Sequence, residues 1–146
     1  MKLAFIGGGN MAQALISGLL GQQFNMSNIL VVELDSEKRD HLAQKFGVMT
    51  SGALADTAKC DAIVLAIKPQ QLQSLAESLI PFLNTQLIIS IAAGILLKDL
   101  SRWLNGYEVI VRAMPNTPAQ IQSGITGLYA LPNVSHSQIT IADQVL

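Results

Sequence analysis

The sequence predicts an α/β protein built on a doubly wound, mostly parallel β-sheet of about seven to eight strands. Apolar runs of strand length alternate along the chain with stretches of helical periodicity, which is typical of this class. The first apolar run leads through three consecutive glycines into a helical pattern. Half of the residues are apolar and only 13% are charged, against roughly 25% in a typical soluble domain. Strands buried on both faces of a sheet, and outer surface covered by a partner or a further domain, account for that composition.

The first part of the chain is expected to alternate strand and helix. The run Leu3–Ile6 predicts the first strand. Apolar residues at helical spacing then predict a helix that Gly21 ends. These residues are Met11, Leu15, Ile16, Leu19 and Leu20. The β-branched run Ile29–Val32, closed by Glu33, predicts a second buried strand.

A polar helix is expected next, capped by Ser36 and extending through Phe46, with Gly47 after it. Residues 47–49 predict a short third strand. A short helix is expected over the stretch that contains Leu54, Ala55 and Ala58. These segments form one half of a doubly wound sheet.

The second half continues the alternation. The apolar run 62–67 predicts the fourth strand. Pro69 is well placed in the first turn of a helix through Leu79, because the N–H that proline lacks would be unpaired there. A strand, a short helix and another strand are then expected over residues 87–91, 98–104 and 108–113.

The pattern changes after Ala113. Residues 114–118, MPNTP, are not expected to continue a strand or a helix. Residues 123–130, which contain Gly124 and Gly127, predict one more strand at an edge of the sheet. Ser135 or Ser137 is expected to cap a final helix, and the chain ends within its pattern.

The segment IGGGNMA, residues 6–12, carries the pattern G-x-G-x-x-A after a strand and before a helix. This is the arrangement of a Rossmann-type dinucleotide-binding fold. Gly7 permits the sharp turn, Gly9 lets the backbone approach a pyrophosphate, and Ala12 lets the helix pack closely on the sheet. The phosphates are expected on the free N–H groups at the start of the helix. The alternative is a glycine-rich turn that only reverses the chain.

Glu33 follows the second strand, about 24 residues beyond Gly9. A carboxylate at this position accepts hydrogen bonds from the adenosine ribose of a dinucleotide and repels a 2′-phosphate. Glu33 therefore slightly favours NADH over NADPH. Lys38 and Arg39, together with Ser36, provide an alternative site for a 2′-phosphate, or form only a solvated helix start.

Two further segments follow strands where ligands of open α/β sheets bind. Lys68, in the segment AIKP, would bring positive charge to a dinucleotide or a substrate carboxylate, or is a surface lysine before a helix. The small residues of SIAAG, residues 90–94, let a flat ring approach the backbone, or only pack tightly in a buried turn.

Charge and composition argue against several classes of function. The net charge of −1 and the absence of a Lys/Arg cluster argue against a nucleic-acid partner or an anionic membrane surface. The longest apolar run, residues 87–97, is shorter than the roughly 20 residues of a membrane span, and no signal peptide is expected. Cys60 is the only cysteine, which suits a reducing cytoplasm.

Other chemistries find no support in the sequence. His41 and His136 lie on polar segments without a carboxylate or cysteine at ligand spacing, so each is expected at the surface and no metal site is predicted. A G-x-S-x-G elbow and a Walker-type lysine are missing, which disfavours acyl transfer and P-loop phosphoryl transfer.

Four separated motifs together resemble the N-terminal domain of pyrroline-5-carboxylate reductase. They are IGGGNMAQALISGL at residues 6–19, AIKPQ at 66–70, SIAAGI at 90–95 and VRAMPNTPA at 111–119. The resemblance runs in order from Lys2 to about Leu131, and four motifs at one family's spacing are far more specific than a single glycine loop.

The resemblance implies a reductase that passes a hydride from NAD(P)H to the cyclic imine of 1-pyrroline-5-carboxylate and forms L-proline, a small-molecule reaction of proline biosynthesis. It implies that the pyrophosphate lies on Ile6, Gly7, Gly8, Gly9, Asn10 and Met11. It implies that the ribose and nicotinamide lie along Ala66, Ile67, Lys68, Pro69, Ile91, Ala92 and Ala93, and that Met114, Pro115 and Asn116 shape the loop beside the nicotinamide.

The resemblance also implies a dinucleotide-binding domain over residues 1–131, with residues 132–146 beginning a helix that leads to a helical C-terminal domain absent from this chain. That domain would make the homo-oligomer and supply the catalytic residues, so this chain is expected to bind dinucleotide without reducing the imine alone. Glu33 departs from family members that prefer NADPH. Alternatives are another dehydrogenase of the 6-phosphogluconate dehydrogenase-like group, a deazaflavin-dependent NADP reductase, or a non-catalytic nucleotide-sensing module.

Overall fold

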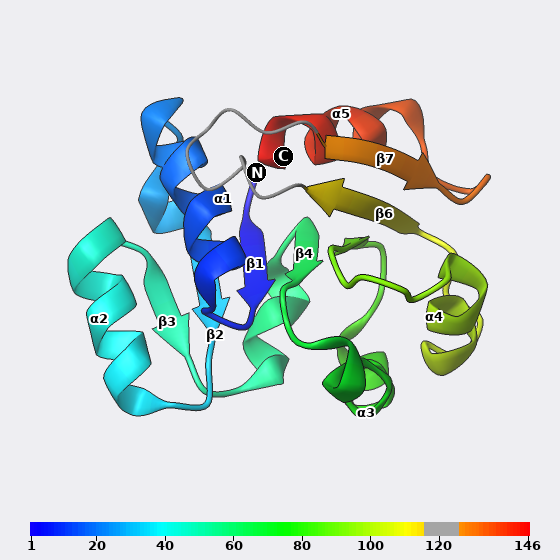
Figure 1. The fold of residues 1–146 in the computed structure, drawn as a ribbon, viewed down its shortest axis with the longest axis horizontal. Helices are drawn as coiled ribbons and strands as arrows, with labels where there is room; N and C mark the ends of the chain where they lie inside the picture. The colour runs from blue at the N-terminus through cyan, green and yellow to red at the C-terminus, as the bar shows by residue number, and fades with distance from the viewer. Residues whose placement is uncertain (116–125) are drawn as a thin grey trace.

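The computed structural model describes residues 1–115 and 126–146, which form a single sheet covered by helices (Figure 1). The sheet has seven strands in the described residues, in the order β3-β2-β1-β4-β5-β6-β7. Strands β1 to β6 run parallel, and β7 pairs antiparallel with β6 at one edge. The predicted fold class is confirmed. The strands are β1 (Leu3–Ile6), β2 (Ile29–Val32), β3 (Met49–Ser51), β4 (Ala62–Leu65), β5 (Leu87–Ser90), β6 (Ile110–Pro115) and β7 (Thr126–Ala130).

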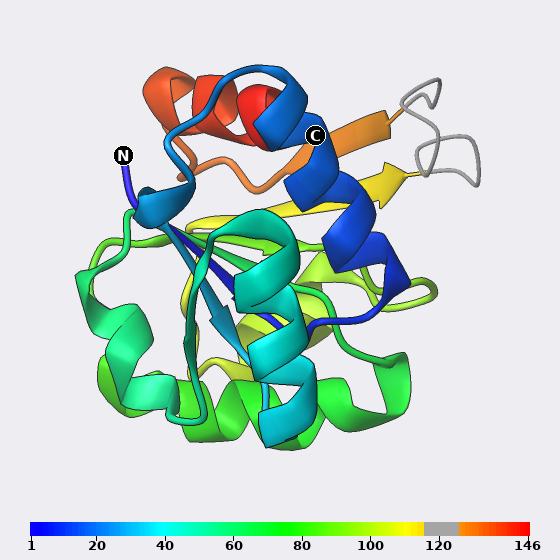
Figure 2. The same cartoon turned by 90° about the vertical axis from the view of Figure 1, so that its left-hand side faces the viewer.

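Helices connect the strands and cover both faces of the sheet. The helices of the described residues are α1 (Asn10–Gly21), α2 (Ser36–Phe46), α3 (Pro69–Leu79), α4 (Leu97–Trp103) and α5 (His136–Val145). Short 3₁₀ turns lie at Met26–Asn28, Leu54–Lys59 and Ile80–Phe82. Figure 2 shows α1 and α5 above the sheet and α3 below it. Among the described residues, none of these helices is long and apolar enough to cross a membrane.

The core consists of two apolar layers, one on each face of the sheet. On one face, α1, α2 and α5 pack against alternate strand residues such as Leu3 and Phe5. On the other face, α3 and α4 pack against the intervening residues, Ala4 and Ile6 in β1. Because both faces of the central strands are covered, their sequences are continuously apolar instead of alternating.

The start of α2 corrects one prediction. Ser36 was expected to cap this helix, but the cap is Asp35, whose carboxylate oxygen Oδ1 accepts hydrogen bonds from the N–H groups of Glu37 (2.9 Å) and Lys38 (3.3 Å). Asp35 has the extended backbone of a cap, and Ser36 is the first helical residue. An aspartate caps as well as a serine does, so the residue one position earlier takes the role.

The end of β6 corrects a second prediction. Residues 114–118 were not expected to continue a strand, yet β6 includes Met114 and Pro115. Strand β5 pairs with β6 only as far as Arg112, and beyond that residue β6 pairs with β7 alone. A proline is tolerated at the last residue of a strand that is paired on one side. The predicted strand 123–130 is confirmed as the edge strand β7 over residues 126–130, and residues 123–125 lie outside the described residues.

The last helix packs on the sheet. Ser135, one of the two predicted caps, accepts a hydrogen bond on Oγ from the N–H of Gln138 (3.3 Å) and donates its own N–H to Oε1 of Gln138 (2.9 Å). This reciprocal pair is a capping box. Ala142 and Val145 of α5 are buried in the same apolar layer as α1.

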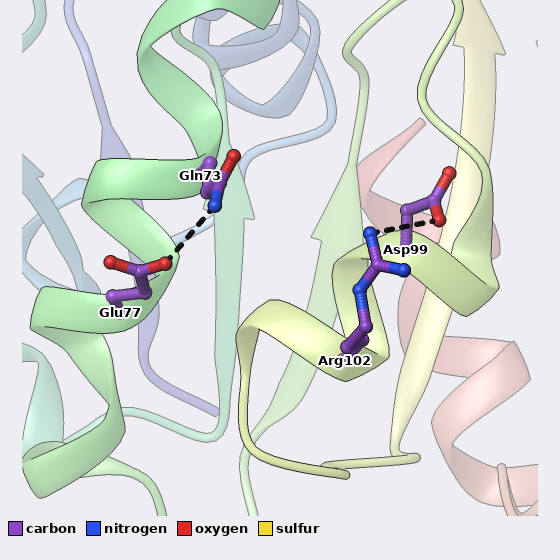
Figure 3. A network of polar contacts seen from close by, with 4 residues as sticks. All are labelled: Gln73, Glu77, Asp99 and Arg102. Atoms are coloured by element: carbon purple, nitrogen blue, oxygen red, sulfur yellow. Dashed lines mark hydrogen bonds and ion pairs between the residues drawn. The ribbon is translucent and has the colours of Figure 1, made fainter.

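Polar pairs lie on the outer helices. Figure 3 shows two of them: Gln73 donates to Glu77 along α3 (3.2 Å), and Arg102 lies 3.4 Å from Asp99 on α4. Such exposed pairs contribute at most a few tenths of a kcal/mol each, about 0.2–0.5 kcal/mol. Changes at these positions are therefore suitable controls for changes near the site.

Tyr107 anchors the chain just before β6. Its O–H donates to the backbone C=O of Gln86 (2.6 Å), a residue that is itself buried ahead of β5. Burial raises the pKa of the Tyr107 phenol above its ordinary value. The folded state therefore holds this proton to higher pH than the unfolded chain does.

The raised pKa of Tyr107 makes the free energy of unfolding depend on pH in the alkaline range. Below the unfolded pKa of about 10 both states are protonated. As the pH rises above that value the unfolded chain ionises first, so the free energy of unfolding falls. Tyr107→Phe is expected to flatten this fall and to lower stability at neutral pH by about 1 kcal/mol, because the Gln86 carbonyl loses its donor. Urea unfolding from pH 7 to 11 measures both effects. An equally steep alkaline fall in the variant would contradict the assignment.

Candidate dinucleotide-binding site

The candidate site lies where the chain changes direction across the sheet. From β1 the chain proceeds outward to β2 and β3, and then returns to β4 on the other side of β1. In open α/β sheets, ligands bind beyond the carboxyl ends of the strands at such a switch point. The glycine segment follows β1 at this point, Glu33 follows β2, and Ala66 follows β4.

Gly7 makes the turn that leaves β1. Its φ of +97° lies in a region that side chains disfavour, and a Cβ built there would be 2.5 Å from the carbonyl oxygen of Ala66. Its N–H donates to Val32 C=O (2.9 Å), and the N–H of Ala66 donates to Ile6 C=O (2.9 Å). The turn therefore lies directly against both neighbouring strands, and only glycine fits it.

Gly9 leaves open space at the start of α1. It is the N-cap residue, with an ordinary extended backbone, and a Cβ built on it meets no atom within 4 Å. No side chain caps α1, and no acidic residue lies in its first turn. The first N–H groups of the helix are thus available to an anion, and the helix dipole favours one there. A pyrophosphate fits this combination of free donors and missing side chain.

The start of α3, like the start of α1, has no side-chain cap. Pro69 occupies the first turn of α3, as predicted, and Lys68 is the N-cap residue without a side-chain hydrogen bond. No acidic residue lies in the first turn. The N-termini of α2 and α5 are capped by side chains instead, by Asp35 and Ser135 respectively. Helix α4 also lacks a side-chain cap, but Asp99 lies in its first turn. Among the described helices, α1 and α3 are thus the ones with neither a side-chain cap nor an acidic residue in the first turn.

Glu33 contacts the glycine segment directly. Its Oε2 accepts the N–H of Gly8 (3.0 Å), and its Oε1 accepts the N–H of Asp35 (3.2 Å). The sequence pattern indicated a ribose contact for this carboxylate and did not indicate the contact with Gly8. Gly8 is buried, and a Cβ on it would be 2.6 Å from Cδ1 of Leu42. The available signal was that the middle position of the run, which the motif leaves unspecified, is also a glycine.

Gln13 and Lys45 extend this network, and neither was a candidate site residue in the sequence analysis. Gln13 Nε2 donates to the C=O of Gly8 (3.0 Å), and Lys45 Nζ donates to Oε1 of Gln13 (3.2 Å). Lys45 is in the last turn of α2. The start of α1 is therefore linked through side chains to the end of α2.

Arg39 lies beside Glu33. Its Nη1 donates to the backbone C=O groups of Glu33 (2.7 Å) and Leu34 (2.9 Å). The same Nη1 would be 3.2 Å from a Cβ built on Gly52, just beyond β3. Of the three residues considered for a 2′-phosphate, Arg39 is held against the end of β2, whereas the side chains of Ser36 and Lys38 are exposed.

The remaining predicted residues lie at the ends of β4 and β5. Ala66 and Ile67 are partly buried, and Lys68 is exposed. After β5, Ala92 is buried, its N–H lies 3.4 Å from Oγ of the buried Ser90, and Ala93 is exposed. Asn116 lies outside the described residues. Within the described residues, no group of His, Cys, Asp or Glu could hold a metal ion.

A mostly parallel sheet with a glycine turn and a bare helix start at its switch point defines the class of Rossmann-type domains, which hold dinucleotides at this position. Residues 2–94 match the family described as NADP oxidoreductase, coenzyme F420-dependent. The chain belongs to this family.

Individual proteins show a more specific similarity than the family does. The chain is 41% identical, over 99% of its length, to the pyrroline-5-carboxylate reductase of Pseudomonas aeruginosa. The solved pyrroline-5-carboxylate reductase of Coxiella burnetii superimposes with a TM-score of 0.94 at 35% identity over 99% of this chain. The pyrroline carboxylate reductase of Plasmodium falciparum, solved with NADP bound, matches with a TM-score of 0.86 at 25% identity and also over 99% of this chain.

These matches confirm the predicted resemblance to pyrroline-5-carboxylate reductase. The chain spans about half the length of these relatives: 54% of the Pseudomonas protein, 54% of the Coxiella chain and 53% of the Plasmodium chain.

Proposed function

We propose that this chain is the dinucleotide-binding part of a reductase that transfers a hydride from NAD(P)H to the cyclic imine 1-pyrroline-5-carboxylate and forms L-proline. The observation that carries the proposal is the start of α1, where Gly9 leaves open space and no side chain or acidic group occupies the helix N-terminus. The similarity to named reductases over 99% of the chain supports the substrate.

In this proposal the chain's own residues bind and orient the cofactor. The segment Ile6 to Met11 holds the pyrophosphate. Its donors are the N–H groups of Gly9, Asn10 and Met11, because those of Gly7 and Gly8 already donate to Val32 and Glu33. Residues 66–69 and 91–93 line the ribose and nicotinamide, and the resemblance assigns Asn116 to the loop beside the nicotinamide. Bound NAD(P)H supplies the hydride. A protonated imine already attracts a hydride, so these residues serve to position the donor and exclude water rather than to supply a strong acid.

For cofactor choice, we propose a slight preference for NADH. The Glu33 carboxylate at the end of β2 suits a free 2′-OH and repels a 2′-phosphate. Arg39, one of the residues considered for a 2′-phosphate, already donates to the backbone carbonyls of Glu33 and Leu34. Both observations favour the cofactor without the extra phosphate.

The relatives are about twice as long as this chain, so we propose that further residues complete the enzyme. Residues 1–131 form the cofactor domain in this proposal, and residues 132–146 lead toward a helical domain that makes a homo-oligomer and holds the catalytic residues for the imine. A cytoplasmic location is part of the proposal, and the single cysteine, Cys60, favours it.

Calorimetric titration and a rate assay test this function together. The 146-residue chain is expected to bind one NADH or one NADPH, with NADH bound more tightly, and to show no turnover of 1-pyrroline-5-carboxylate. The full-length protein is expected to turn over the imine with either cofactor. Absence of binding to both cofactors would overturn the proposed function, and full activity of the chain alone would overturn the division into two parts. A preference for NADPH above about tenfold, or 1.4 kcal/mol, would overturn the role of Glu33 in cofactor choice.

A further inference from the structure

Both backbone polar groups of Gly8, its N–H and its C=O, are held by side chains from different parts of the chain. Glu33, at the end of β2, accepts the Gly8 N–H on Oε2 (3.0 Å). Gln13, in α1, donates from Nε2 to the Gly8 C=O (3.0 Å). Buried or partly buried backbone groups in loops usually find water or backbone partners, so two side-chain partners on one glycine are a specific arrangement.

These contacts fix the two peptide planes on either side of Gly8. In a planar trans peptide the C=O and the following N–H point in opposite directions. With the Gly8 C=O turned toward Gln13, the Gly9 N–H points away from Gln13. With the Gly8 N–H turned toward Glu33, the Gly7 C=O points away from Glu33. The direction of the backbone donor at Gly9 is thereby set by residues that themselves lie outside the glycine run.

Two residues of helix α2 further restrict the conformation of the chain at Gly8. Leu42 of α2 leaves no room for a side chain at Gly8, since Cδ1 would be 2.6 Å from a Cβ there. Lys45, in the same helix, donates to Oε1 of Gln13 (3.2 Å) and so orients the amide with its Nε2 toward Gly8. The Gly8 peptide is confined by packing as well as by hydrogen bonds.

We propose that Glu33 and Gln13 form a clamp on Gly8 that positions the glycine turn for the pyrophosphate of the dinucleotide. They are positioning residues, because they act through the Gly8 peptide. The proposal rests on the proposed dinucleotide binding and adds to it a role for Glu33 that does not depend on the ribose. It also assigns a function to Gln13, to which the glycine pattern G-x-G-x-x-A gives no role.

Gln13→Met tests the clamp, because methionine keeps the length of the side chain and removes the amide. A neutral amide cannot discriminate a 2′-OH from a 2′-phosphate by charge, so the Kd values of NADH and NADPH are expected to rise by the same factor, about two- to tenfold for one lost hydrogen bond. The ratio of the two Kd values is expected to stay unchanged. Gln73→Met is the matched control, since Gln73 makes a comparable amide contact on the outer face of α3, with Glu77 (Figure 3), and it should leave both Kd values at the wild-type level.

Glu33→Ala and the double variant test whether both residues fix the same turn at Gly8. If they do, the Gln13 change costs much less in the Glu33→Ala background than in the wild type, because the turn is already released. Amide exchange measured by NMR on the cofactor-free chain provides a readout without ligand: the Gly8 N–H is expected to exchange faster in Gln13→Met and Glu33→Ala, and at the wild-type rate in Gln73→Met.

The outcomes separate the two proposals. Wild-type Kd values in Gln13→Met, fully additive effects in the double variant, or unchanged Gly8 exchange would overturn the clamp while leaving cofactor binding intact. A wild-type chain that binds neither cofactor would overturn the proposed function, and the exchange rates would still decide whether the clamp exists.

Discussion

Replacing Gly9 by alanine is expected to weaken dinucleotide binding by about 10- to 100-fold, which corresponds to the roughly 1–3 kcal/mol that an extra methyl group costs in a close-packed contact. The free energy of unfolding is expected to change by less than about 1 kcal/mol, because the residue has an ordinary extended backbone and its added Cβ meets no protein atom within 4 Å. Calorimetric titration with NADH and urea unfolding measure the two quantities separately.

The control for this variant is Gly18→Ala, farther along α1. A Cβ at Gly18 also meets nothing within 4 Å, and alanine in a helix interior is favoured by up to about 1 kcal/mol over glycine. Binding should therefore be unchanged and stability equal or higher. If Gly9→Ala bound NADH as tightly as Gly18→Ala does, the pyrophosphate could not lie on this turn.

Gly7→Ala is expected to act on the fold, with a loss of stability of about 2–5 kcal/mol from backbone strain and steric overlap together. The strain arises from the φ of +97°, and the overlap arises from the Ala66 carbonyl oxygen, 2.5 Å from the added Cβ. That oxygen belongs to the backbone just after β4 and cannot rotate away. Urea unfolding monitored by circular dichroism measures the loss.

Gly47→Ala separates the two causes. Gly47 also has a positive φ, +72°, but a Cβ there lies in open space. This variant should lose only the conformational contribution, about 1–2 kcal/mol. Equal losses in the two variants would contradict the close approach of Gly7 to Ala66.

Much of the fold could be predicted because its strands are buried on both faces. Continuous apolar runs such as 62–67 and 87–91 predicted β4 and β5 to within two residues at their ends. The helix and strand boundaries that were predicted wrongly depend on competing residues or on contacts with other strands. Asp35 and Ser36 are both good caps, and whether Pro115 ends a strand depends on its partner strand, which local sequence does not contain.

The candidate site also has a part that could be predicted from the sequence and a part that could not. The glycine turn follows from backbone requirements that are local, so Gly7 and Gly9 could be assigned from their spacing. The contact of Gly8 with Glu33 joins residues 25 positions apart, and it exists only once β1 and β2 are paired. The contact with Gln13 is local, but it forms only when the turn and the start of α1 are in place. No periodicity or motif encodes such a contact, and the spacing of Glu33 indicated only the ribose.

The place of β1 in the middle of the sheet has a consequence for the order in which the protein can assemble. Strand β1, which is synthesised before β2 and β4, pairs with β2 on one side and β4 on the other. The N–H of Lys2 donates to Oδ2 of Asp61, 59 positions later (2.7 Å). One edge of β1 therefore stays unpaired until the ribosome has released β4. Contacts of such sequence separation slow folding, and an apolar strand with an open edge is prone to pair with other chains. The segment that shapes the cofactor turn is thus the one most exposed to misassembly during synthesis.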